Sequence, residues 1–88
     1  MTKITDKNKI LVIFRNYLGE HRFIHAIFSR EHRKGGINYE GHGILGINTK
    51  CPESPEEEIS ITLTSRDVNY NRPLAILDLS KIEYILML

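Results

Sequence analysis

The stretch from residue 74 to residue 86, Leu-Ala-Ile-Leu-Asp-Leu-Ser-Lys-Ile-Glu-Tyr-Ile-Leu, changes its apolar face part-way along. The apolar residues share one parity before the change and the other parity after it: Ala75, Leu77 and Leu79, then Ile82, Tyr84 and Leu86. A strand cannot move its side chains to the other face without a bulge or a short helical turn. We therefore predict two strands joined by a kink at Ser80-Lys81, which is how small barrels turn a corner.

Two further segments have the pattern of strands. In residues 59–64 the apolar side chains alternate with small polar ones, so one face is expected in the core and the other in water: Ile59, Ile61 and Leu63 against Ser60, Thr62 and Thr64. Residues 41–47 are apolar with three glycines, which mark a bend or a close backbone approach. Glycine, proline and charge predict loops or turns at residues 29–39, 51–58 and 67–73.

Residues 9–28 allow two interpretations. In the favoured one, residues 9–14 form a β-branched strand, Gly19 supplies the turn, and residues 22–28 form the return strand of a hairpin. The alternative is a helix, because the apolar residues also fit a helical stripe: Ile10, Ile13, Phe14, Tyr17, Leu18, His21, Ile24, Ile27 and Phe28. Three apolar residues fall off that stripe: Leu11, Val12 and Phe23. Residues 1–8 are polar and are expected to be frayed.

Together these segments predict an all-β or β-dominated fold over a single domain, residues 1–88. The expected architecture is a small barrel of five to six strands, of the SH3-like or Sm-like kind, with its last strand kinked. The stretch Gly43-Ile-Leu-Gly-Ile47 resembles the bent, glycine-containing strand of Sm-like proteins. An Arg-Gly near the last kink, the second signature of that family, is absent, so the resemblance concerns architecture and not membership.

The composition limits the function classes. Eighty-eight residues make one core with little room for a cleft, and a net charge of +1 argues against a dedicated duplex-DNA binder. Cys51 is the only cysteine, so it forms no intramolecular disulfide. No apolar run suits a secretory signal or a membrane span, which predicts a cytoplasmic location in a cell or an infected host. The abundance of isoleucine, lysine and asparagine suits an AT-rich genome and a viral or mobile-element accessory protein.

A basic segment with histidines and glycines is the candidate ligand site. Arginine forks and glycine amides bind phosphate oxygens, and a tyrosine ring can stack on a base. We therefore predict a binding site for a small anionic ligand of the nucleotide type or for a short RNA, made by Arg30, His32, Arg33, Lys34, Gly35, Gly36, Asn38, Tyr39 and His42. The alternative that stays open is an ordinary solvated loop.

Catalysis, a metal and a cofactor are not predicted. The four histidines and Cys51 match no recognised zinc spacing, and no paired-carboxylate or Ser-His-Asp arrangement is visible. A small RNase-like hydrolase is the enzymatic alternative, with His32, Arg33, Glu40 and His42 as its candidates.

The second function hypothesis is a protein-binding inhibitor or adaptor. It would use edge strands and an acidic run made of Glu53 and residues 56–58, which could face a basic partner. The chain ends on an apolar run, residues 82–88, which is expected to close the barrel as part of the core or to pair its strand edge with a second copy. A homo-oligomer, most simply a dimer, is the expected assembly.

Overall fold

The computed structural model describes residues 1–32, 35–49, 59–64 and 73–88, and these ranges hold six strands and one α-helix. In chain order the elements are β1 (Thr2–Ile4), α1 (Lys7–Tyr17), β2 (Phe23–His32), β3 (Gly35–Thr49), β4 (Ile59–Thr64), β5 (Pro73–Asp78), the 3₁₀ turn η1 (Leu79–Lys81) and β6 (Ile82–Met87). The predicted β-dominated fold is confirmed. The predicted loop at residues 51–58, and residues 67–72 of the predicted turn, lie outside the described residues.

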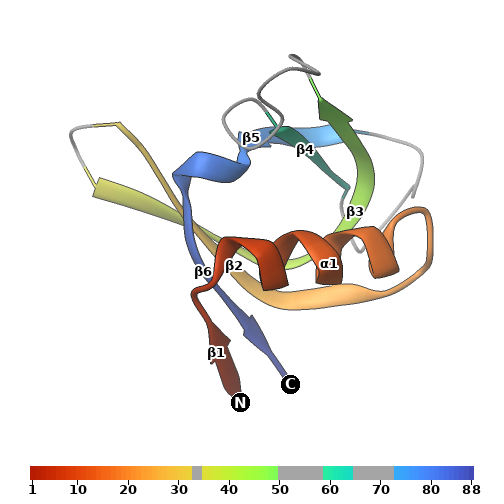
Figure 1. Cartoon of the computed structure of the whole chain (residues 1–88), viewed down its shortest axis with the longest axis horizontal. Helices are drawn as coiled ribbons and strands as arrows, with labels where there is room; N and C mark the ends of the chain where they lie inside the picture. The colour runs from red at the N-terminus through yellow and green to blue at the C-terminus, as the bar shows by residue number, and fades with distance from the viewer. Residues whose placement is uncertain (33–34, 50–58, 65–72) are drawn as a thin grey trace.

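The six strands form one antiparallel sheet in the order β1-β6-β2-β3-β4-β5. Figure 1 shows that the sheet curls around the core, that α1 lies across its open side, and that η1 carries the chain from β5 back to β6. Within the described residues the ladders begin at β1 and stop at β5. The structure therefore supports a curled sheet, and closure of a barrel stays a prediction.

The first half of the predicted hairpin is wrong, because residues 9–14 belong to helix α1. Asp6 caps the helix by accepting a hydrogen bond from the Asn8 amide at 2.9 Å. Gly19, with φ +68°, follows the helix end, where glycine is favoured because the left-handed conformation is open to it. Burial of the helical stripe outweighs the β-branched composition of this run: Ile10 and Phe14 have no exposed surface. The predicted return strand is confirmed as β2.

Two segments that were expected to be irregular are strands. Residues 2–4 were predicted to be frayed, but they pair with β6 from Thr2↔Met87 to Ile4↔Ile85. Residues 29–39 were predicted to be a loop, but residues 29–32 extend β2 and residues 35–39 begin β3, with Ser29 opposite Ile37. In both cases backbone pairing with a neighbouring strand supplies the order that the polar composition does not indicate.

The predicted kink is confirmed: η1 covers Leu79–Lys81 and separates β5 from β6. A second irregularity follows at Glu83. Ser29 pairs with Ile82 and the preceding residue of β2, Phe28, pairs with Tyr84, so Glu83 has no directly opposite partner on β2. This β-bulge reverses the parity once more. Ile82 lies in the core as predicted, but Ile85 joins it there in place of Tyr84 and Leu86, which are half-buried.

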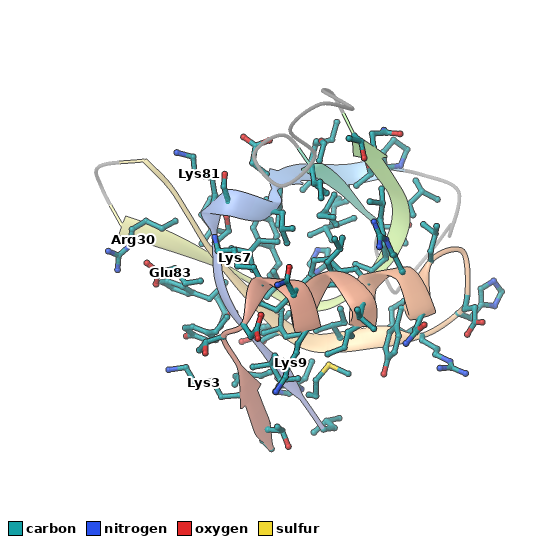
Figure 2. All side chains as sticks on the ribbon, in the orientation of Figure 1. Lys3, Lys7, Lys9, Arg30, Lys81 and Glu83 are labelled. Atoms are coloured by element: carbon teal, nitrogen blue, oxygen red, sulfur yellow. The ribbon has the colours of Figure 1, made fainter. Side chains whose placement is uncertain are left out.

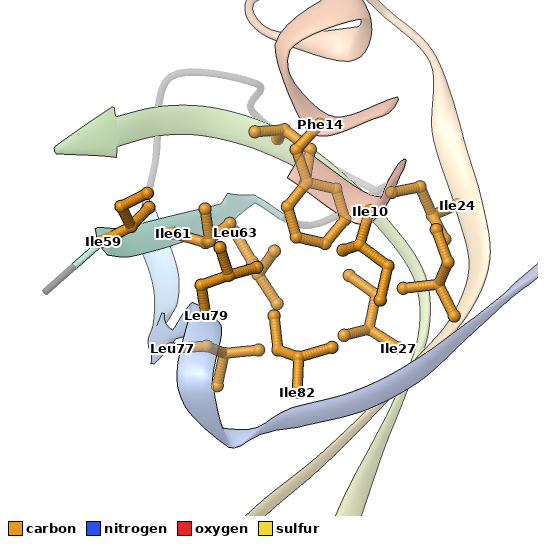
Figure 3. Close-up of a cluster of buried hydrophobic side chains, with 12 residues drawn as sticks. Ile10, Phe14, Ile24, Ile27, Ile59, Ile61, Leu63, Leu77, Leu79 and Ile82 are labelled. Carbon is orange, nitrogen blue, oxygen red and sulfur yellow. The ribbon is translucent and has the colours of Figure 1, made fainter. Parts of the chain in front are cut away.

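The core fills the space between the curled sheet and α1. Figure 3 shows the ring of Phe14 and the side chain of Ile10 packed among aliphatic side chains of β2, β4, β5, η1 and β6. The prediction for β4 is confirmed on one face, since Ile59, Ile61 and Leu63 are buried. It is wrong for the other face, because Ser60 and Thr64 are buried as well. β4 lies between β3 and β5, so neither of its backbone edges is open.

Candidate functional site

The predicted binding segment is divided between the two faces of the sheet. Directly opposite residues of antiparallel strands share a face. Asn38 is opposite Phe28 and exposed, whereas Tyr39 is opposite Ile27 and packs against the core. His42 is opposite Ile24.

Between these residues of β3, Gly41 has a φ of +63°, outside the extended region of backbone conformation. Tyr39 and His42 consequently meet edge to face, with ring centroids 5.6 Å apart. The Nδ1 atom of His42 is buried without a hydrogen-bond partner among the described residues. This pair therefore faces the core, and Tyr39 does not present an open ring to a ligand.

The other predicted residues that the structure describes lie at the end of β2 and the start of β3. Arg30 and Asn38 are exposed, and Asn38 Nδ2 donates to Glu40 Oε1 at 3.4 Å. His32 ends β2 opposite Gly35, which has a φ of +110°. Arg33 and Lys34 lie outside the described residues. The structure thus brings Arg30, Gly36 and Asn38 to the outer face and separates them from Tyr39 and His42.

A cluster that the sequence did not predict lies on that same outer face. The rings of Phe28 and Tyr84 stack with centroids 5.0 Å apart and planes 6° from parallel. The ammonium of Lys3 stands 4.4 Å from the centroid of the Tyr84 ring, a cation–π contact. We call Lys3, Phe28, Arg30, Glu83 and Tyr84 the aromatic–basic face; they come from β1, β2 and β6.

Gly36 allows Phe28 to lie close to β3. A Cβ atom at position 36 would come within 2.3 Å of Phe28 Cζ and 2.8 Å of its two Cε atoms. Any other residue at this position would displace the ring. Glycine at this position, predicted as a phosphate contact, has in the structure the role of leaving room for the aromatic stack.

Positive charge gathers beside the stack. Arg30 Nε lies 3.1 Å from Glu83 Oε1, and both side chains are substantially exposed. Lys7 Nζ donates to the carbonyl oxygen of Leu79 at 3.1 Å and to that of Ser80. Burial lowers the pKa of Lys7, and the nearby Glu83 carboxylate acts against this by raising it. In Figure 2 these groups lie on one side of the molecule with Lys81 and Lys3.

Local sequence patterns contain little signal for these residues. Tyr84 was assigned to the core because the bulge at Glu83 cannot be recognised from alternation alone. Lys3 belongs to a segment that was expected to be frayed, and Phe28 becomes a neighbour of Tyr84 only through the pairing of β2 with β6. The arrangement depends on non-local strand pairing, which local patterns do not show.

A separate groove of about 350 Å³ runs between β1 and α1. It is lined by Ile4, Asn8, Lys9, Val12 and Ile13. Its exposed surface is apolar, so it offers few groups that could orient an anionic ligand. The aromatic–basic face combines planar rings with cations and is the stronger candidate.

Comparisons with protein families, with curated proteins and with solved structures found no match to this chain. Among the residues that the structure describes, none of the clusters of His, Cys, Asp and Glu has the three members needed to hold a metal ion. The one helix of that part of the chain is too short and too polar to cross a membrane.

Proposed function

We propose that this chain is a non-enzymatic binding module for an anionic, nucleotide-type ligand or a short RNA, held on the aromatic–basic face. The observation that supports the proposal most is the Phe28–Tyr84 stack with Lys3 over one ring and Arg30 two residues from the other. Bases stack on aromatic rings, and phosphates pair with lysine and arginine. A cytoplasmic location suits such a ligand and a chain whose single cysteine forms no intramolecular disulfide.

The contacts suggest how a nucleotide would enter. Lys3 is exposed and long, so its ammonium can leave the face of Tyr84 and follow a phosphate while a base takes its place over the ring. Arg30 can turn its guanidinium from Glu83 to a second phosphate oxygen, because their ion pair is exposed. The net charge of +1 favours a short ligand over a long nucleic acid.

Replacing Tyr84 by leucine is expected to weaken binding of a short single-stranded RNA by about 10- to 100-fold, because base stacking on an aromatic ring contributes about 1–3 kcal/mol. Tyr84→Phe keeps the ring and is the matched control, with affinity close to that of the wild type. Isothermal titration calorimetry at low salt, with RNA, nucleoside monophosphates and inorganic phosphate, measures the effect. Equal affinity of the leucine variant, or no binding of RNA or nucleotide by the wild type, would contradict the proposal.

A second candidate function is self-association through β5. The predicted interface at the chain end does not suit the sheet, because β6 lies between β1 and β2. β5 is the end strand, with Leu74 57% and Ile76 65% exposed. The other end strand, β1, has three residues and carries Lys3, a charge that opposes edge pairing. β5 has six residues and carries its charge, Asp78, only at its last position, so the sheet extends most simply as a two-fold dimer in which β5 pairs antiparallel with β5 of a second copy.

This dimer can be tested with Ile76→Lys. A lysine on the outer face of β5 would bring two like charges close together across the two-fold axis, so we expect a dimer in the wild type and a monomer in the variant. Val12→Lys, on the exposed side of α1, is the control and should remain dimeric. Multi-angle light scattering at micromolar concentration gives the masses. A monomeric wild type would rule the dimer out, and dissociation by Val12→Lys alone would locate the interface on α1.

A further inference from the structure

Glu83 occupies an unusual position in the sheet. It is the extra residue of the β6 bulge, between Ile82, which pairs with Ser29, and Tyr84, which pairs with Phe28. Bulges redirect side chains out of the regular alternation. As a result the Glu83 carboxylate reaches Arg30 on β2 while the adjacent Tyr84 stacks on Phe28.

Glu83 interacts with cations from two elements. Its Oε1 atom lies 3.1 Å from Arg30 Nε, with 41% of the Glu83 side chain and 61% of the Arg30 side chain exposed. It also lies close enough to Lys7, at the start of α1, to favour the charged form of that lysine. The Lys7 ammonium is itself hydrogen-bonded to the carbonyl oxygens of Leu79 and Ser80. A single carboxylate thus sits where the cations of β2 and α1 come together.

Carboxylate and phosphate oxygens bind the same guanidinium donors. We propose that Glu83 is a built-in competitor for the ligand phosphate, which holds Arg30 in the free protein and is displaced when the phosphate binds. This inference rests on the proposed function of the aromatic–basic face. An exposed ion pair favours its closed form by a factor of about five at most, so a phosphate can exchange with it readily.

Competition by Glu83 determines which ligands bind to the aromatic–basic face. The ligand phosphate must bind Arg30 strongly enough to displace the Glu83 carboxylate. Its binding must also outweigh the repulsion between the phosphate and the displaced carboxylate, which stays nearby. A lone nucleoside, which has no phosphate, gains nothing from the exchange. Glu83 therefore selects phosphate-bearing ligands with more than one contact and keeps single small anions from occupying Arg30.

The test is Glu83→Gln, which keeps the size of the side chain and removes its charge. We expect this variant to bind a nucleoside monophosphate and a short RNA about 2- to 5-fold more tightly than the wild type, and a nucleoside equally well. The gain should shrink as salt is added, because screening weakens the charge interactions. In an Arg30→Ala background the same change should give a smaller gain, since the residue that Glu83 occupies is gone.

The matched control is Glu20→Gln. Glu20 forms an ion pair with Arg22 at 2.8 Å, and its exposure is similar to that of the Glu83–Arg30 pair. The pair lies just before the start of β2, far along the strand from Arg30. Replacing Glu20 changes the net charge by the same amount. Thermal unfolding of each variant confirms that it is folded. If the wild type binds and Glu83→Gln gains nothing, or gains no more than Glu20→Gln, the competitor role is refuted while the proposed function stands. If neither the wild type nor Glu83→Gln binds any phosphate ligand, the proposed function fails and this inference with it.

Discussion

Replacing Phe14 by alanine is expected to lower the free energy of unfolding by about 3–5 kcal/mol. The ring has no exposed surface and fills the space between α1 and the curled sheet, so its removal loses the burial and leaves a cavity. The total stability of a domain is on the order of 5–15 kcal/mol, so the variant would be close to unfolded at moderate temperature. Urea denaturation followed by circular dichroism measures the loss.

Val12→Ala is the matched control on the same helix. Val12 is 54% exposed, and its truncation should change the stability by no more than about 0.5 kcal/mol. The pair also separates the two interpretations of residues 9–14. In a strand, positions 12 and 14 share a face and would cost similar amounts, whereas in a helix they lie about 200° apart. Comparable losses for the two variants would therefore contradict α1.

The parts of the fold that could be predicted are those that depend on local alternation. The core face of β4 follows from Ile59, Ile61 and Leu63, and the turn at Ser80-Lys81 follows from the change of parity around it. In both cases the side chains of a few consecutive residues carry the information. The bulge at Glu83 was not predicted, because the two residues that follow it, Tyr84 and Ile85, are both apolar and either could face the core.

Residues 9–14 could not be assigned in this way, because their composition and their spacing disagree. The run is β-branched and apolar, but Ile10 and Phe14 are four residues apart and both are needed in the core. The helix is stabilised by packing against the part of the core that the sheet leaves uncovered, and this packing is a tertiary interaction. Asp6, whose side chain accepts from the Asn8 amide, is a residue type common at helix starts, but the segment around it was expected to be frayed.

The candidate site was predicted in part. Arg30 and Asn38 were expected at a binding surface and lie on the outer face of the sheet. Lys3, Phe28 and Tyr84 were missed, because they meet only when β1 and β2 pair with opposite edges of β6. Tyr39 was expected to stack on a base, but it lies opposite Ile27 and packs against the core. Strand pairing decides which side chains share a face, and local composition does not show that pairing.

Replacing Ile61 by alanine is the second change with a large expected effect, a loss of about 2–4 kcal/mol in the free energy of unfolding. Ile61 has no exposed surface, and β4 is paired on both sides, with Ile47 opposite it on β3 and Leu77 on β5. The sheet is continuous at this point, so the neighbouring backbone cannot move in to fill the cavity without disturbing two ladders. The loss should therefore lie in the upper part of the range for aliphatic truncations.

Ile37→Ala tests whether burial, and not the loss of a β-branched residue from a strand, produces that loss. Ile37 is also in a strand, β3, but it is 47% exposed, so its truncation should cost about 1 kcal/mol or less, mostly through the strand preference. Both variants are compared with the wild type in urea, at a concentration where the oligomeric state is the same for all three. A loss below about 0.5 kcal/mol for Ile61→Ala, or equal losses for the two isoleucines, would show that β4 is not in the centre of the core. A large difference with unchanged m-values would locate the main stabilising contacts where β3, β4 and β5 enclose Ile61.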